Sequence, residues 1–130
     1  TYKAIKEGYA VIYQSHFMRT FIHVFDIARV FLFAIENQDK MRDNVYNVGS
    51  DNMNFSKKEI CELINADVPD VYFNYADIGE DADKRNYEVS YENIQKLGYK
   101  TDITLSEGIK ELIKAIPLVK TMNPYFNVVK

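Results

Sequence analysis

Arginine is the residue type in this chain best suited to bind an anion, and the 130 residues hold only four of them. Arg19 directly precedes the run T-F-I-H-V-F-D, and Arg85 follows an acidic stretch from Asp77 to Asp83. A guanidinium group can donate two parallel hydrogen bonds to phosphate oxygens and stays charged at any working pH. The two positions therefore offer phosphate binding, and the alternative for each is a solvated arginine on the surface.

The other residues with chemical potential favour neither a metal site nor a nucleophile. His16 and His23 are seven residues apart, and no cysteine or paired carboxylate stands at ligand spacing, so we expect no metal site. Cys61 lies among isoleucine and leucine in helical spacing, which favours a core thiol. The five glycines form no G-x-G-x-x-G turn, so we expect the chain alone to bind no dinucleotide.

Composition and charge indicate an ordinary globular domain. The length of 130 residues, with 47% apolar and 27% charged residues, fits one domain around a single core. The net charge of -3 argues against nucleic-acid binding, which needs clustered basic residues. The longest apolar run, 30–35, is far shorter than the roughly 20 residues of a membrane-spanning helix. A single cysteine and the lack of a signal-peptide pattern favour the cytoplasm.

The hydrophobic pattern predicts short strands and several helices. We expect strands at 10–13, 20–24, 45–48 and 71–75, and helices at 1–8, 26–37, 56–66, 91–97 and 104–116. Two pairs, Ser56 with Glu59 and Thr104 with Glu107, have the spacing of a capping box. Asp26 is expected to be structural, as a cap or dipole partner at the start of its helix. That helix is apolar nearly all round, which indicates burial on more than one side.

Six short motifs occur in a characteristic order over residues 1 to about 114. They are R-x-F-I-H-V-x-D, V-Y-N-V-G, S-K-K-E-I, D-K-R-N-Y-x-V-S, K-L-G-Y and L-S-E-G-I-K-E-L. This order resembles the second half of the extended short-chain dehydrogenase/reductase family, the NAD(P)-dependent epimerases and dehydratases of nucleotide sugars. The resemblance implies an α+β part of an α/β enzyme, a small sheet of short strands packed with about five helices, whose Rossmann half is missing. We therefore expect residues 1–130 to be one substrate-binding domain, a fragment of a longer enzyme and inactive alone.

The resemblance also implies which residues bind substrate. In this family the arginine of R-x-F-I-H-V reaches the diphosphate of the nucleotide sugar, and that position matches Arg19. A second basic contact matches Arg85, with Lys84 as its neighbour. Asn52 follows the V-Y-N-V-G motif in a loop that can approach the nucleotide.

No catalytic residue is expected within the chain. Tyr2 and Lys6 match the family's Y-x-x-x-K pair, in which the lysine lowers the pKa of an acid/base tyrosine. Ten tyrosines and twelve lysines in this chain give about one such match by chance. The family's true pair also lies much further before the R-x-F-I-H-V strand, so we expect it before Thr1.

The parent enzyme implied by the resemblance oxidises a sugar hydroxyl with tightly held NAD or NADP. Its expected partners are the nucleotide sugar, its own N-terminal Rossmann domain and a second copy in a homodimer. Two other functions stay open: a non-catalytic nucleotide-sensing module of the same fold, and a protein-interaction domain that uses the apolar helix 27–35. The residues before Thr1 would discriminate, since a glycine-rich turn together with Y-x-x-x-K supports the enzyme.

Overall fold

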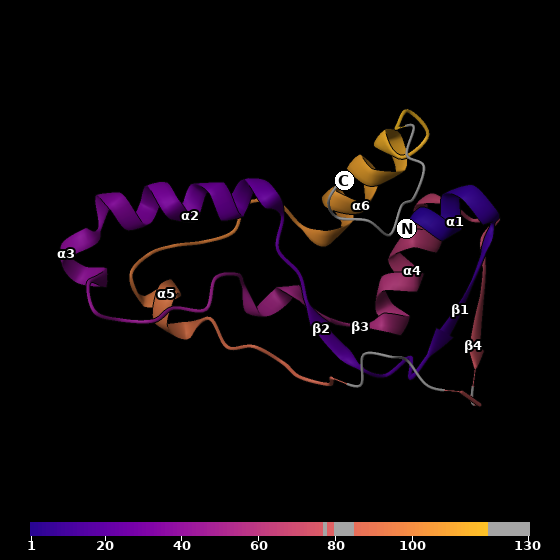
Figure 1. Cartoon of the computed structure of the whole chain (residues 1–130), viewed down its shortest axis with the longest axis horizontal. Helices are drawn as coiled ribbons and strands as arrows, with labels where there is room; N and C mark the ends of the chain where they lie inside the picture. Colours follow the sequence, from indigo (N-terminus) through magenta and orange to yellow (C-terminus); the bar gives the residue numbers. More distant parts are fainter. Residues whose placement is uncertain (77, 80–84, 120–130) are drawn as a thin grey trace, which may run out of the picture.

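The computed structural model describes residues 1–76, 78–79 and 85–119 and has an α+β architecture (Figure 1). Its elements, in chain order, are α1 (Tyr2–Glu7), β1 (Tyr9–Tyr13), β2 (Met18–Thr20), α2 (Val24–Glu36), α3 (Gln38–Met41), the 3-10 helix η1 (Asp51–Met53), β3 (Asn54–Ser56), α4 (Lys57–Asp67), β4 (Tyr72–Ala76), α5 (Glu92–Lys96) and α6 (Leu105–Ala115). The α+β class predicted from the sequence is confirmed. The short helix α3 was not expected, and it brings the described α-helices to six.

The strands of the described residues form two separate pairs. β1 and β4 are parallel, with Tyr9 opposite Tyr72 and Tyr13 opposite Ala76. β2 and β3 are antiparallel, with Arg19 opposite Phe55. A parallel pair needs a long crossover connection, and the β2–β3 pair lies within that crossover together with α2 and α4.

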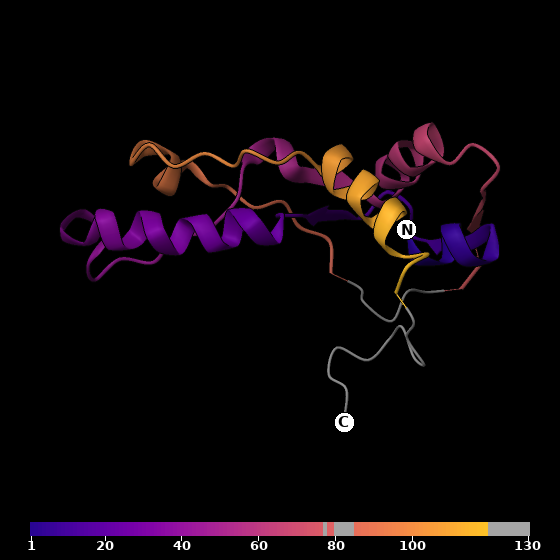
Figure 2. The ribbon, with the colours of Figure 1, turned by 90° about the horizontal axis from the view of Figure 1, so that it is seen from above.

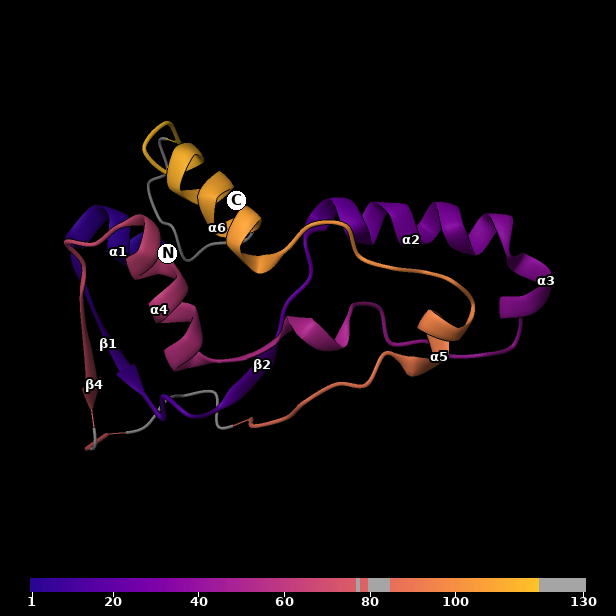
Figure 3. The ribbon, with the colours of Figure 1, turned by 180° about the vertical axis from the view of Figure 1, so that it is seen from behind.

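The elements gather at the two ends of an elongated molecule (Figures 1 and 2). At one end, α1, α4, α6, β1 and β4 surround a core of Ala4, Ile64, Val71 and Ile109. At the other end, α2, α3 and α5 lie together, and the core there consists of Val30, Tyr91, Ile94 and Tyr99. Strand β2 lies between the two groups, as the view from behind in Figure 3 also shows. The β2–β3 pair therefore connects the two ends of the molecule.

Local capping signals fix where several helices begin and end. Ser56 Oγ accepts a hydrogen bond from Glu59 N at 3.2 Å, and Glu59 Oε2 accepts one from Ser56 N at 2.7 Å. Thr104 and Glu107 form the same reciprocal pair at 3.3 and 2.8 Å. Gly8 ends α1 with φ 71°, a left-handed conformation that glycine adopts without a steric penalty. Both predicted capping boxes are confirmed.

Two of the predicted strands are wrong. Residues 20–24 do not form a strand, because β2 ends at Thr20 and α2 already begins at Val24. The helix is capped by His23, whose Nδ1 accepts from Phe25 N at 3.2 Å, so Asp26 lies in the first turn and is not the cap. A strand needs a neighbour to pair with, and β3 supplies three residues only. Residues 45–48 likewise pair with no strand of the described chain, and Tyr46 and Val48 instead pack against the core beside α5.

Candidate anion-binding site

Arg19 lies at the centre of β2 and is held from two directions. Its Nη1 donates a hydrogen bond to the carbonyl oxygen of Met18 at 2.8 Å and another to the carbonyl oxygen of Arg85. The guanidinium carbon lies 5.8 Å from the centroid of the Tyr87 ring, within the range of a cation–π contact. The guanidinium of Arg19 is therefore fixed between its own strand and residues 85–87.

Residues 85–91, which we call the strap, run beside β2 and β3 toward α5 (Figure 3). The strap is attached by side chains and not by a ladder of main-chain hydrogen bonds. Asn86 Oδ1 accepts from Met18 N at 2.8 Å, and Asn54 bonds to both main-chain groups of Val89 at 3.0 and 3.1 Å. Asn47 Nδ2 donates to the Ser90 carbonyl at 3.2 Å, Asp51 Oδ1 accepts from Tyr91 N at 3.1 Å, and the hydroxyls of Thr20 and Tyr91 are hydrogen-bonded. These contacts hold the strap against β2 and β3, beside Arg19.

The structure brings together two of the four substrate-binding residues predicted from the sequence. Arg19 and Arg85 are 66 residues apart in the chain, and the main chain of Arg85 lies on the guanidinium of Arg19. Asn52 is exposed in η1, next in sequence to Asp51, which holds the strap at Tyr91. Lys84 lies outside the described residues.

An open hollow of about 470 Å³ lies between the strap, Met18 of β2 and residues 51–54. Its lining residues are Met18, Asp51, Asn54, Glu88, Val89 and Ser90. Carboxylate groups such as those of Asp51 and Glu88 repel phosphate but accept hydrogen bonds from hydroxyl or amino groups. The hollow therefore suits an uncharged polar part of a ligand, and the arginines suit its charged part.

Sequence reasoning missed Asn54, Asn86 and Glu88. Asn54 stands two residues before the N-cap Ser56, where an asparagine reads as a turn residue. Asn86 directly follows Arg85, and its amide binds the main chain of β2. The available signal was the run of polar side chains around Arg85, in a stretch without helical or strand periodicity.

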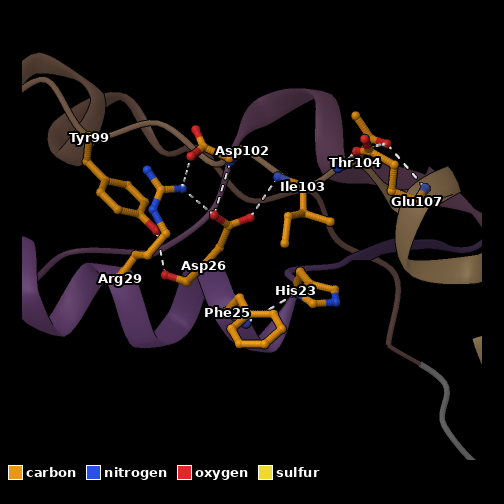
Figure 4. Close-up of polar contacts among 9 residues, drawn as sticks. All are labelled: His23, Phe25, Asp26, Arg29, Tyr99, Asp102, Ile103, Thr104 and Glu107. Atoms are coloured by element: carbon orange, nitrogen blue, oxygen red, sulfur yellow. Dashed lines mark hydrogen bonds and ion pairs between the residues drawn. The ribbon is translucent and has the colours of Figure 1, made fainter. Parts of the chain in front are cut away.

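Asp26 joins the start of α2 to the segment that leads into α6 (Figure 4). It is fully buried, and its two carboxylate oxygens accept from Asp102 N at 3.0 Å and from Ile103 N at 3.1 Å. Arg29 Nη1 contacts Asp26 Oδ1 and Asp102 Oδ2 at 2.7 Å each. Tyr99 donates its hydroxyl proton to the Asp26 carbonyl at 2.6 Å, and burial together with Asp26 raises the pKa of Tyr99. Asp26 thus has a structural role, but as a tether for residues 102–103.

His23 and Cys61 have ordinary structural surroundings among the described residues. His23 Nε2 lies 3.0 Å from Glu111 Oε2 at the edge of an apolar hollow of about 420 Å³ between residues 21–24 and α6. Cys61 is buried, and its burial raises the pKa of the thiol. The described residues contain no group of three or more His, Cys, Asp or Glu side chains that could hold a metal ion. None of the helices described is long and apolar enough to cross a membrane.

One side of α2 is uncovered. Val24, Phe25, Phe31, Leu32 and Ile35 are between 61 and 73% exposed, and we call this set the α2 face. Val30 and Phe33 point to the opposite side, into the core with Tyr91 and Tyr99. The sequence predicts burial of this helix on more than one side, but within the described residues only the side with Val30 and Phe33 is covered.

Comparison with known proteins shows the fold of this chain. No protein-family model matches it. A GDP-D-glycero-L-gluco-heptose synthase from Campylobacter jejuni, crystallised in the presence of NADPH, is similar with a TM-score of 0.65 and 21% identity, covering 90% of this chain and 35% of that chain. A GDP-mannoheptose C4 reductase from Campylobacter jejuni with NADP bound has a TM-score of 0.66 and 23% identity, covering 84% of this chain and 32% of its own.

RMD from Pseudomonas aeruginosa, complexed with NADPH, is similar with a TM-score of 0.63 and 16% identity, covering 88% of this chain and 38% of that protein. The chain therefore spans about a third of the length of the solved structures that it matches. At these identities the similarity establishes a shared fold, which makes up about a third of each of these longer chains.

Proposed function

We propose that this chain is the substrate-binding part of an NAD(P)-dependent enzyme that acts on a nucleotide sugar, and that Arg19 and Arg85 bind the nucleotide diphosphate. The contact between the Arg85 carbonyl and the Arg19 guanidinium carries the proposal, because it joins two motif positions 66 residues apart. Two of the similar solved structures are named for GDP-linked heptoses, one in the presence of NADPH and one with NADP bound, which supports the same substrate class here. The order of the six sequence motifs supports it independently.

The proposed division of labour assigns the chemistry to the rest of the parent protein. An N-terminal Rossmann domain would hold NAD or NADP, and when bound there the nicotinamide supplies hydride exchange with a sugar carbon. This domain's own residues bind the diphosphate and orient the sugar, so that remote binding energy fixes the reacting hydroxyl in place. A domain with that role alone is inactive, and the parent works in the cytoplasm as a homodimer.

Preorganisation makes Arg19 a good phosphate ligand. Carbonyl oxygens of Met18 and Arg85 fix Nη1, and the Tyr87 ring faces the guanidinium, so the side chain loses little freedom on binding. The Arg85 main chain lies at this contact with Arg19, and the Arg85 side chain brings a second positive charge. We propose Asn52, exposed in η1, as a further polar contact, and Lys84 as a basic neighbour of Arg85.

The test is alanine substitution of each arginine in the whole protein. Arg19→Ala and Arg85→Ala should each weaken nucleotide-sugar binding by ~1.5 to 3 kcal/mol, the range for charge-assisted hydrogen bonds, and leave NAD(P) binding unchanged. Arg42→Ala, an exposed arginine after α3, is the matched control. If Arg19→Ala lowers the melting temperature while KM stays the same, Arg19 is structural and the proposed site is wrong.

The exposed α2 face favours a second candidate, a protein-interaction module. Five large apolar side chains on one helix surface are suited to contact another protein surface. One assay separates the enzyme, the sensing module and the interaction module: the whole protein is mixed with nucleotide sugars and either NAD(P)+ or NAD(P)H. Conversion of a nucleotide sugar to a product indicates the enzyme, and nucleotide-sugar binding without conversion indicates the sensing module. If neither binding nor conversion occurs, the interaction module is supported.

A further inference from the structure

We infer that Asn54 is a positioning residue for the anion-binding site: its carboxamide sets the register of the strap on β3 and so places the main chain of Arg85 on Arg19. Its effect on ligand binding rests on the proposed function. The two hydrogen bonds between the Asn54 carboxamide and the Val89 main chain, which we call the clamp, do not depend on the proposed function.

Asn54 imitates a neighbouring strand. Its Oδ1 accepts a hydrogen bond from Val89 N at 3.1 Å, and its Nδ2 donates to the Val89 carbonyl at 3.0 Å. One side chain thereby satisfies both main-chain groups of one residue, as a paired strand would. Nδ2 also donates to the Asp51 carbonyl at 3.2 Å. Because two carbonyl oxygens face this nitrogen, only one of the two amide orientations fits.

The clamp fixes which strap residue meets Arg19. Thr20 lies opposite Asn54 and Arg19 opposite Phe55, so the β2–β3 pair has a defined register. Val89 packs against the core beside α5, which selects it over its neighbours as the residue that Asn54 binds. A slip of one residue would move the strap by about 3.3 Å, enough to break a hydrogen bond to Arg19. The Asn86 contact to Met18 would be lost by the same slip.

A positioning role predicts that Asn54 acts through the strap and not through stability alone. Asn54→Ala removes both bonds to Val89, and Asn54→Asp keeps the acceptor while placing a carboxylate oxygen against two carbonyls. Either change should weaken binding of guanosine diphosphate to the whole protein about tenfold. In an Arg19→Ala background the same change should weaken binding less than about twofold, because the guanidinium that the Arg85 carbonyl holds in place is already gone.

The experiment combines this double-mutant cycle with hydrogen exchange at the Val89 amide. Exchange should be at least about tenfold faster in Asn54→Ala than in the unmodified protein, since the amide loses its acceptor. Asn44→Asp is the matched control, because the side-chain amide of Asn44 has one described hydrogen bond, to the nearby Arg42 carbonyl. If the alanine variant does not fold, the same measurements use Asn54→Leu, which also removes both bonds to Val89 and nearly keeps the side-chain volume.

The outcomes separate the clamp from the proposed function. Unchanged exchange at Val89, or an equal loss of affinity in both backgrounds, overturns the positioning role of Asn54. Faster exchange together with full affinity in Arg19→Ala leaves the clamp in place and overturns the proposed role of Arg19. Faster exchange with a loss of affinity only in the protein that keeps Arg19 supports both.

Discussion

At the scale of single residues, buried polar groups hold segments together that are far apart in the sequence. Asp26 is the clearest case, because its carboxylate is fully buried and bound by two main-chain amides and by Arg29. A buried carboxylate is stable only when its hydrogen-bonding capacity is met. Asp26 therefore links the start of α2 to the segment before α6.

We predict that Asp26→Asn lowers the free energy of unfolding by about 2 to 4 kcal/mol. Asparagine keeps one acceptor oxygen, but its NH₂ group meets the amide of Asp102 or Ile103, and the charge opposite Arg29 is lost. Urea unfolding of this chain measures the change. Asp39→Asn, an exposed site in the first turn of α3, is the control and should change stability by less than about 0.5 kcal/mol. Equal effects of the two substitutions would contradict the tether.

The residues of the candidate site could be predicted only in part. Arg19 and Arg85 were found because their motifs are distinctive, and the structure places them together. Asn54 could not be predicted, since nothing in the sequence shows that its amide meets Val89 35 positions away. Long-range pairing between a side chain and a main-chain segment has no local pattern.

At the scale of elements, local signals were reliable and strands were not. Both capping boxes and the end of α1 at Gly8 depend on contacts within four residues, so the sequence predicts them. The strands predicted at 20–24 and 45–48 are wrong, because a strand exists only beside a partner and the sequence does not show which partner is present. Residues 45–48 have strand-like composition without a described strand to pair with.

The capping boxes give stability a defined pH dependence. Hydrogen bonds from Ser56 and from Thr104 lower the pKa of Glu59 and Glu107 respectively. A lowered pKa in the folded state means that the unfolded state binds more protons, so this stabilisation is present above the unfolded pKa of about 4.3 and is lost as pH falls through the folded values.

Urea midpoints measured between neutral and acidic pH should therefore decrease on acidification, and Glu107→Gln should make that decrease smaller. Glutamine can still accept the Thr104 hydrogen bond but does not titrate. Glu36→Gln, at the end of α2 and outside any capping box, provides the same charge change as a control. A pH dependence that is the same in Glu107→Gln and Glu36→Gln would contradict the role of the box.

At the scale of the whole molecule, two small cores are joined through the β2–β3 pair, and the α2 face is left uncovered. We propose that the remainder of the parent protein covers this face. Large exposed apolar patches are unusual on monomers and promote association.

We predict that the 130-residue chain binds a hydrophobic dye and self-associates, and that Phe31→Ser relieves both. Phe31 is 67% exposed on the α2 face. Phe33→Ser is the paired variant. The centroid of the Phe33 ring lies 5.3 Å from that of the Tyr99 ring, so this change should cost about 2 kcal/mol or more of stability without removing the α2 face. Light scattering and dye fluorescence measure the result. A monodisperse chain without dye binding would contradict the uncovered face.

The chain of 130 residues should bind neither NAD(H) nor NADP(H) at millimolar concentration. A dinucleotide pyrophosphate needs a glycine-rich turn that leads into a helix N-terminus, and the sequence contains none. Calorimetric titration of the isolated chain with each cofactor tests this directly. Saturable binding would show that a cofactor site lies within these residues and would refute the proposed division of labour.

A ligand series on the whole protein shows whether Arg19 and Arg85 recognise a diphosphate. We would titrate the protein and its Arg19→Ala variant with guanosine, guanosine monophosphate and guanosine diphosphate at one fixed salt concentration. We expect at least about tenfold tighter binding of the diphosphate than of guanosine in the unmodified protein, and a much smaller difference in Arg19→Ala. Equal affinity for all three ligands, or the same preference with and without Arg19, would contradict it.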